Sequence, residues 1–161
     1  MSDDIEEAVR SGDLATVTGL LRSNGELVSG STTTGMPLLE FAALLGTAAI
    51  VQAFIDAGAE VDVRDRLGST PLGAAASSGR VAVVRTLLSS GADPNVEDNE
   101  GKISSRPIWQ CLFSAHSNID TLRELLRGGA NTSGADEHGY TLRDWATPDQ
   151  LVVLLEADDH Q

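Results

Sequence analysis

The sequence predicts an all-α solenoid built from helix-turn-helix units. The interval from Gly46 to Gly79 recurs unchanged from Gly58 to Gly91. Within residues 65–95, a turn, a small-residue helix, a second turn and an apolar helix follow one another. A repeat of about 33 residues, the length of that interval, is typical of stacked units that share a narrow continuous core. We therefore expect a surface that meets another macromolecule, not a globular core around a buried active site.

The first helix of this central unit is expected to begin after Thr70. The threonine hydroxyl can accept a hydrogen bond from a free N–H of the first turn, and Pro71 suits a position that needs no backbone donor. Residues 74–76 are all alanine, so neighbouring helices can approach closely. Gly79 suits the positive-φ turn that reverses the chain after a short helix.

The second helix of the unit is predicted from an apolar stripe at helical spacing. The stripe consists of Val81, Val84, Leu87 and Leu88. Gly91 is expected to end this helix as a C-terminal cap. Residues 93–101 are polar and rich in turn formers, so they predict a connection to the next unit.

This pattern resembles the ankyrin repeat. That family reads Gly-x-Thr-Pro-Leu-His-x-Ala, then a Gly turn, then Val-x-x-Leu-Leu and Gly-Ala-Asp-x-Asn, and residues 65–97 match nearly all of it. Gly73 stands where the family has histidine, so greater dependence on apolar packing is expected there. The resemblance spans about residues 5–156 and implies an ankyrin-repeat solenoid with polar caps at both ends.

Two further units are more degenerate. In residues 31–64, the interval from Pro37 to Gly46 is nine residues, against eight from Pro71 to Gly79, which predicts one residue inserted in or before the first helix. Residues 98–135 hold five extra residues. We assign about three of them to residues 102–106 and two to the first helix.

The ends of the chain are predicted to be capping units within one domain, residues 1–161. Residues 5–30 lack the Thr-Pro-Leu motif, and four nearby acidic residues are expected on the outside: Asp3, Asp4, Glu6 and Glu7. Residues 136–156 carry Gly-Tyr-Thr-Leu and a final helix. A constant spacing of ten residues between glycines supports the register of the units. It occurs from Gly58 to Gly68, from Gly91 to Gly101 and from Gly129 to Gly139.

The acidic composition bears on the choice of partner. The formal net charge is −13 and the pI is about 4.4, so nucleic acid and anionic membranes are expected to be repelled. A basic protein partner is favoured, although solubility alone is an alternative explanation of the charge. We expect a monomer.

The single cysteine indicates a reducing compartment. Cys111 cannot form an internal disulfide, and its apolar neighbours favour a buried small hydrophobe over a reactive thiol. Residues 1–7 are acidic without an apolar segment, and the longest apolar stretch, residues 41–55, is shorter than the roughly 20 residues of a membrane span. A cytoplasmic location is therefore expected.

Motifs for catalysis or metal binding are not found. His116, His138 and His160 are scattered, which argues against a zinc site. Residues 93–104 place Asp98 and Ser104 where a calcium loop needs glycine and glutamate. With no nucleophile elbow or phosphate-binding glycine loop either, we predict that the protein is not an enzyme and has no cofactor.

The resemblance implies that partners contact the turn tips and the concave first-helix face. Carried over by position, the partner-binding residues are Met36, Arg64, Arg66, Leu67, Ser69, Asn99, Glu100, Lys102, His138 and Tyr140. The first helices add Leu44, Leu45, Ser77, Ser78, Ala115 and His116.

Four apolar or aromatic residues are considered as binding anchors. Leu67 is either an anchor or an ordinary surface leucine, and Tyr140 is a candidate hot spot. For Trp109 a core position is favoured over a hot spot, and Trp145 is expected to be buried against the fourth unit. The leading hypothesis is a non-enzymatic protein-protein interaction module, in its sharper form an inhibitor of a basic protein. The alternative is a self-assembling structural or scaffold subunit.

Overall fold

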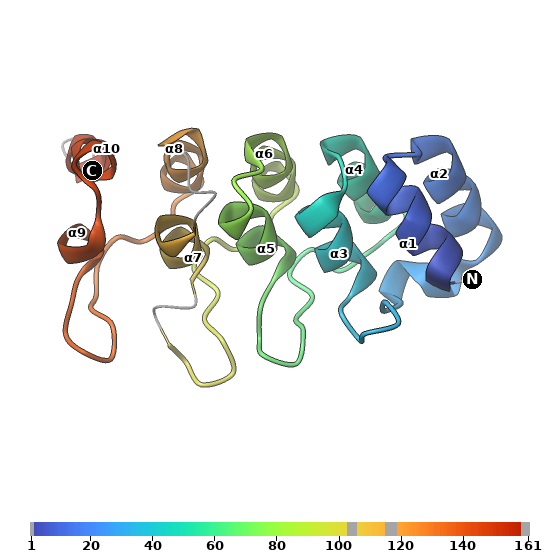
Figure 1. Ribbon diagram of the computed structural model, residues 1–161, viewed down its shortest axis with the longest axis horizontal. Helices are drawn as coiled ribbons and strands as arrows, with labels where there is room; N and C mark the ends of the chain where they lie inside the picture. Colours follow the sequence, from blue (N-terminus) through green and yellow to red (C-terminus); the bar gives the residue numbers. More distant parts are fainter. Residues whose placement is uncertain (1, 103–105, 115–118, 159–161) are drawn as a thin grey trace.

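The computed structural model describes residues 2–102, 106–114 and 119–158, which form a row of antiparallel helix pairs (Figure 1). One row of first helices contains α1 (Ser2–Ser11), α3 (Leu38–Leu45), α5 (Pro71–Ser77), α7 (Pro107–Phe113) and α9 (Leu142–Trp145). The second-helix row contains α2 (Leu14–Ser23), α4 (Ala48–Asp56), α6 (Val81–Ser89), α8 (Ile119–Arg127) and α10 (Pro148–Asp158). A short 3-10 helix, η1 (Gly25–Ser29), follows α2. The described part contains no strands beyond two isolated bridges, so the predicted all-α solenoid is confirmed.

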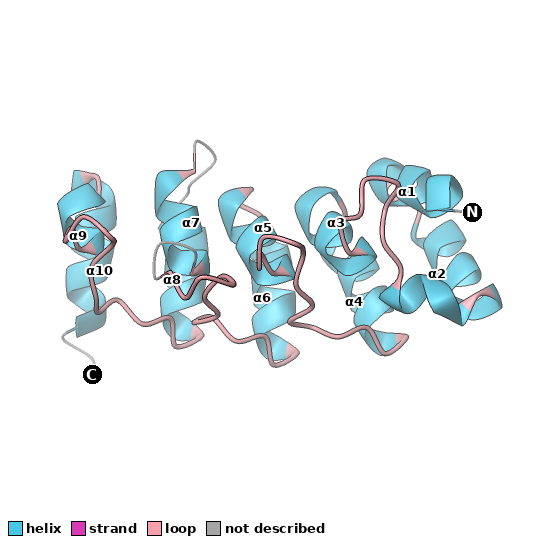
Figure 2. Cartoon of the chain, turned by 90° about the horizontal axis from the view of Figure 1, so that it is seen from below, coloured by secondary structure: helices cyan, strands magenta, loops and turns pink. Residues whose placement is uncertain are grey.

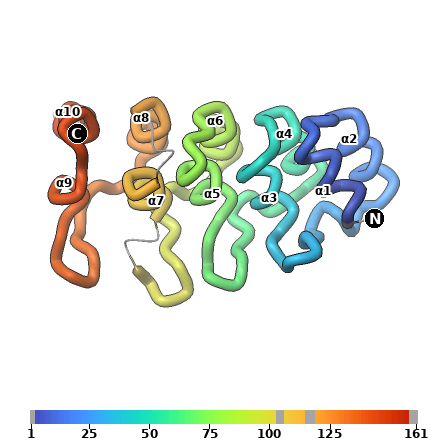
Figure 3. Tube along the Cα trace, in the orientation of Figure 1, coloured from blue at the N-terminus to red at the C-terminus, as the bar shows by residue number. Residues whose placement is uncertain are grey.

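Turn tips precede the first helices and extend to one side of the stack, as the tube in Figure 3 shows. We name them by their residues: tip 31–37, tip 64–70, tip 97–102 and tip 135–141. In tip 64–70 the Asp65 N–H donates to the Ser69 carbonyl at 3.0 Å, and tip 135–141 repeats this bond from Asp136 to Tyr140 at 2.8 Å. A glycine closes each turn: Gly68 has a φ of +87°, and Gly139 has a φ of +85°. Glycine reaches this region without strain from a Cβ atom.

The prediction of an inserted residue in residues 31–64 is wrong. Gly35, Gly68 and Gly101 all have positive φ and are evenly spaced, so the period is strict across these tips. Pro37 is the N-cap of α3, the position that Thr70 holds at α5. Pro37 is therefore equivalent to Thr70 and not to Pro71, which removes the apparent extra residue.

The extra residues of 98–135 are distributed differently from the prediction. Helices α5 and α7 both contain seven residues, so α7 holds no insertion. The two residues assigned to the first helix fall instead between α7 and α8, within residues 114–118. The three assigned to 102–106 agree with the start of α7 at Pro107, and residues 103–105 lie outside the described residues.

The core runs between the two rows along the length of the stack. On α6 the stripe is formed by Val83, Val84 and Leu87, which are at most 2% exposed, whereas Val81 and Leu88 are only partly buried. Trp109 and Cys111 on α7 are fully buried, as favoured from the sequence. One continuous core of this kind is how stacked units bury faces that no single unit can bury alone.

The two end pairs differ in what they expose. On α1 the acidic residues Asp3, Asp4 and Glu7 are exposed, but Glu6 is buried, contrary to expectation. Glu6 accepts a hydrogen bond from the Thr33 N–H at 2.8 Å, so its carboxylate joins α1 to tip 31–37. At the other end, α10 leaves two apolar side chains about half exposed, Val152 and Leu155.

Candidate functional site: the tips and first-helix row

Aspartates within the tips hold the backbone in place. Asp65 Oδ1 accepts hydrogen bonds from the N–H groups of Leu67 and Ser69, both at 2.8 Å. Asp98 accepts from the N–H groups of Glu100 and Lys102 at 2.9 and 3.0 Å. The bond from Lys102 is the main reason that the pKa of Asp98 is lowered. The tips are therefore ordered loops that present neighbouring side chains in defined directions.

Successive tips pack directly on one another. A Cβ atom on Gly68 would come within 2.6 Å of the Asn99 backbone nitrogen, so tip 64–70 lies against tip 97–102. The Asn99 side-chain amide also donates to the Arg66 carbonyl at 3.2 Å. On the other side, the Arg66 guanidinium lies 3.3 Å from where a Cβ atom on Gly35 would be. The first three tips therefore form one continuous surface, which Figure 2 shows from the tip side.

The predicted partner-binding residues all lie on the four tips, with His138 and Tyr140 on tip 135–141. Met36 and Ser69 are partly buried, and Met36 packs against the core. The others are exposed: Arg64, Arg66, Leu67, Asn99, Glu100, Lys102, His138 and Tyr140. Leu67 is 78% exposed, and Lys102 forms an ion pair with Glu100 at 2.7 Å.

The first-helix residues predicted to join this surface differ in exposure. Leu45 is 40% exposed at the end of α3, whereas Leu44 and the serines at the end of α5, Ser77 and Ser78, are partly buried. Ala115 and His116 lie outside the described residues. The tips therefore provide most of the accessible predicted side chains.

A buried carboxyl group lies behind tip 64–70. Glu40 on α3 is only 3% exposed and stands one repeat before Gly73, at the position where the family pattern has histidine. Burial, together with the nearby negative charge of Asp65, raises the pKa of Glu40 to about 7, although a side-chain hydrogen bond with Ser69 opposes the shift. In this unit a glutamate therefore replaces the histidine as the link between a helix and the next tip. The feature of the sequence that could have indicated Glu40 is a carboxylate within an otherwise apolar helix.

Phe113, Tyr140 and Trp145 form a second exposed feature, which we call the aromatic surface. The rings of Phe113 and Trp145 meet edge to face with centroids 5.3 Å apart, and those of Tyr140 and Trp145 do so at 5.6 Å. All three side chains are about half exposed. Buried Trp109 packs against this group through Phe113, with ring centroids 5.7 Å apart.

The aromatic surface corrects two predictions. Trp145 does contact the fourth unit through Phe113, but it is 49% exposed and not buried. Phe113 was absent from the predicted binding residues because it follows Leu112 in an apolar run that indicated a core helix. The short helix α9 ends at Trp145, so little structure covers the outer side of these rings.

Asp136 holds Trp145 in place. The Trp145 indole Nε1–H donates to Asp136 Oδ2 at 3.1 Å, while Asp136 Oδ1 accepts from the N–H groups of His138 and Tyr140. Partial desolvation acts to raise the pKa of Asp136, but these hydrogen bonds outweigh it and the pKa is lowered. The pKa of Asp144 is also lowered, chiefly by the side-chain hydrogen bond from Thr141. Both carboxylates are therefore ionised at neutral pH.

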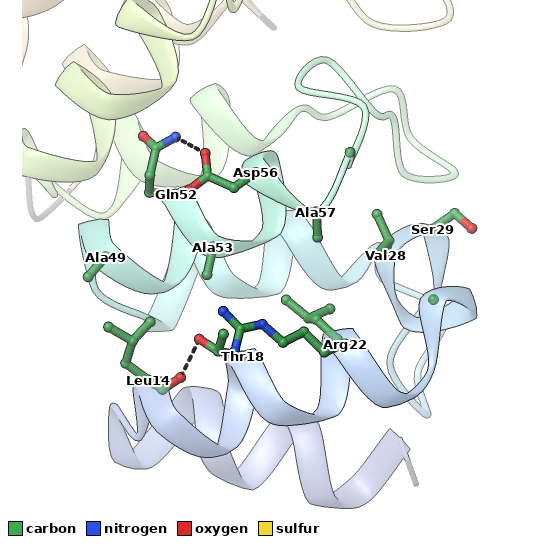
Figure 4. Close-up of a pocket in the computed structure, with 13 residues that line it drawn as sticks. Leu14, Thr18, Arg22, Val28, Ser29, Ala49, Gln52, Ala53, Asp56 and Ala57 are labelled. Carbon is green, nitrogen blue, oxygen red and sulfur yellow. Dashed lines mark hydrogen bonds between the residues drawn. The ribbon is translucent and has the colours of Figure 1, made fainter.

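An open groove of about 840 Å³ lies on the second-helix row between α2 and α4 (Figure 4). Small or apolar side chains such as Leu14, Val28 and Ala53 line much of it. Two of its polar side chains bond along their own helices: Thr18 donates to the Leu14 carbonyl at 2.7 Å, and Gln52 donates to Asp56 at 2.8 Å. No group of three or more His, Cys, Asp or Glu in the described ranges is placed to hold a metal ion. The same ranges contain no helix with the length and hydropathy of a membrane span.

Comparison with known proteins gives one family match. A family model for ankyrin repeats, in three copies, matches residues 5–98 of the 161-residue chain. The match runs from α1 to the beginning of tip 97–102, so the aromatic surface lies beyond it. No curated protein matches the sequence.

Proposed function

Because the chain belongs to the ankyrin-repeat family, we propose that it is a non-enzymatic module that binds a partner protein through its tips and first-helix row. Ankyrin repeats are generally protein-protein interaction modules. The observation that carries the proposal is the continuous surface of tips 31–37, 64–70 and 97–102. Leu67, 78% exposed beside Arg66, is the central contact that we propose on this surface.

Ordered tips favour tight binding for a physical reason. Side chains that are already positioned lose less conformational freedom on association, so more of the contact free energy remains as affinity. The hydrogen bonds from Asp65 and the packing of Gly68 on Asn99 provide this order. A large apolar side chain flanked by charge is also a common arrangement for a binding anchor.

We propose that the partner is basic and that the protein inhibits it by covering its functional surface. The net charge of −13 supports this choice, because opposite charges accelerate encounter and restrict the choice of partner. A cytoplasmic location is part of the proposal and rests on the single cysteine, Cys111, which is buried.

The test is affinity capture from the source lysate with three forms of the protein. The wild type is compared with the double variant Arg66→Ala, Leu67→Ala and with Arg123→Ala, which changes an exposed residue on the second-helix row. Each capture is performed at low and high salt and read by mass spectrometry. Circular dichroism confirms that the three forms are folded.

The expected result is a basic protein that the wild type and Arg123→Ala retain and the double variant loses. Its loss from the wild type at high salt would support the electrostatic part of the proposal. A captured protein that the double variant retains fully would show that tip 64–70 is not the contact. Inhibition is then tested by adding the purified chain to an activity assay of the captured protein.

A second candidate function, self-assembly into a structural or scaffold subunit, is favoured by one observation. Val152 and Leu155 are 54% and 48% exposed on α10, at the end of the described stack. Two chains that met there would cover these side chains. A mass that stays monomeric over a wide concentration range would exclude this function, whereas a dimer that Val152→Glu dissociates would support it.

A further inference from the structure

The aromatic surface faces an environment with a strong excess of negative charge. Residues 135–149 contain four acidic residues and one arginine, a net charge of −3. Asp136 bonds to the Trp145 indole, and Asp144 precedes Trp145 on the same helical turn. The negative charge of Asp136 reaches Asp144, where it acts to raise the pKa of that carboxyl. Two ionised carboxylates therefore lie close to three half-exposed rings.

We propose that the aromatic surface receives an arginine side chain from a basic segment of the partner protein. The proposal rests on the proposed function and names the anchor by which the partner is held. A guanidinium stacks on aromatic faces and can also donate paired hydrogen bonds to a carboxylate. Phe113, Tyr140 and Trp145 supply the faces, and Asp144 supplies the acceptor.

Asp144 is suited to accept such a bond. Its Oδ2 accepts from the Thr141 N–H and hydroxyl, both at 2.7 Å. Its Oδ1 accepts no hydrogen bond from the described part of the chain, so it can accept one from an arriving guanidinium. Asp136 has a different role, since it already accepts three hydrogen bonds and orients the Trp145 ring.

Two cations of the fourth unit are held by acidic residues of tip 97–102. Arg106 is held by Glu97, with 3.1 Å between Arg106 Nε and Glu97 Oε1. Lys102 forms an ion pair with Glu100, at 2.7 Å. Within the described ranges, the cation-π contact that does occur joins Arg10 to the Phe41 ring, 5.0 Å from its centroid, on the first two pairs.

The charge also distinguishes arginine from other ligands that stack on rings. Nucleobases stack well on tryptophan and tyrosine, but they bring phosphates that Asp136, Glu137 and Asp144 would repel. A neutral apolar segment would gain nothing from these carboxylates. The combination of rings and negative charge therefore favours a cation with a planar face.

The test uses two short synthetic peptides, one with arginines between glycines and the other with citrulline in place of each arginine. Citrulline retains the planar shape but lacks the positive charge. Binding is followed by nuclear magnetic resonance of the two tryptophan indole N–H groups, Trp109 and Trp145, in the full chain. The buried Trp109 serves as an internal reference, and Trp145→Leu assigns the signals.

Affinities are then compared by fluorescence anisotropy of the labelled arginine peptide. Trp145→Leu removes the ring that meets both of the others, and Tyr140→Ala tests the surface without altering a helix. Leu14→Ala is the matched control, because it removes an exposed apolar side chain from α2, on the second-helix row. Circular dichroism establishes that each variant is folded.

The expected result is a saturable shift of the Trp145 indole signal with the arginine peptide and none with the citrulline peptide. Trp145→Leu and Tyr140→Ala should each weaken binding about two- to thirty-fold, the range of a cation-π contact, while Leu14→Ala leaves it unchanged. Equal shifts with both peptides would overturn the proposal, as would an equal loss in Leu14→Ala, which would show that the loss is not specific to the aromatic surface.

This experiment fails independently of the test of the proposed function. A partner that is captured through tip 64–70 while the arginine peptide leaves Trp145 unaffected would overturn the arginine anchor alone. Conversely, specific binding of the peptide at Trp145, with no captured protein that depends on Arg66 and Leu67, would support the anchor and count against tip 64–70 as the contact.

Discussion

Buried Glu40 connects the stability of the protein to pH. An ordinary glutamate is charged at neutral pH because water solvates the carboxylate, but Glu40 is 3% exposed and lies near Asp65. Its pKa is raised from 4.5 to about 7. The folded state therefore binds this proton more tightly than the unfolded state does.

We predict that stability falls as pH rises from about 4.5 to about 7 and that Glu40→Gln removes this part of the fall. Between these values the folded state holds more protons, so each rise in pH favours the unfolded state. The free energy of unfolding, measured with urea across this interval, should change by roughly 1–3 kcal/mol less in the variant. Glu7→Gln, at an exposed position on α1, is the control. Parallel curves for the wild type and Glu40→Gln would contradict the prediction.

Leu87 and Leu88 are neighbours with different expected contributions. Leu87 is fully buried on α6, whereas Leu88 is partly buried and lies against Gly128. Leu87→Ala should lower the free energy of unfolding by about 2–5 kcal/mol, because a cavity remains in a packed core. Leu88→Ala should lower the free energy of unfolding by less. Leu67→Ala, at an exposed position, should change it by no more than about 0.5 kcal/mol. Urea unfolding of the three variants checks this order, and equal losses at all three positions would contradict it.

At the scale of the element, the tips are stabilised by their own turns and by contact with the next tip. The turn contribution comes from Asp65 and its equivalents, and from a glycine with positive φ. The contact contribution differs along the chain. Gly68 lies against the backbone of Asp98 and Asn99, whereas a Cβ atom on Gly139 would have nothing within 4 Å.

Comparison of Gly68→Ala with Gly139→Ala should separate these two contributions. Both glycines have nearly the same φ, so alanine should introduce similar strain of roughly 1–2 kcal/mol. Only at Gly68 would the new Cβ atom also collide with backbone, at 2.6 Å from the Asn99 nitrogen. We expect Gly68→Ala to be the more destabilising in thermal unfolding. Equal shifts in melting temperature would show that the tips do not support one another.

For the whole molecule, a narrow stack must tolerate a net charge of −13. Like charges repel more strongly in the compact state than in the extended unfolded chain, so the net charge opposes folding. Ion pairs such as Arg85 with Glu124, at 2.9 Å between α6 and α8, offset little of this because the arginine side chain is 64% exposed and well solvated.

We predict that the protein is more stable at an ionic strength of about 0.15 M than at very low salt. The Debye length is then about 8 Å, which screens repulsion between distant carboxylates. The urea midpoint at neutral pH should rise with sodium chloride and then level off. A midpoint that falls over this range would show that attractive ion pairs outweigh the overall repulsion.

Local signals were sufficient for the helices and turns of the central unit. Thr70 caps α5 through its hydroxyl, with 3.2 Å to the Gly73 nitrogen, and Gly79 adopts the positive φ that its position requires. These outcomes depend on sterics and hydrogen bonds within a few residues, which a sequence displays directly. The same holds for the burial of Leu87, because helical spacing places it on the inner face.

Register and exposure needed the tertiary structure. Pro37 has the residue type of Pro71 but the position of Thr70, and only the start of α3 distinguishes the two. Glu6 and Glu40 are buried because a neighbouring tip covers them, and Trp145 is half exposed because α9 ends at it. The sequence by itself determined the repeat, its turns and its inner stripe, since those follow from local geometry. The tertiary structure decided which carboxylates are buried and which rings are exposed, because burial depends on contacts between units far apart in the chain.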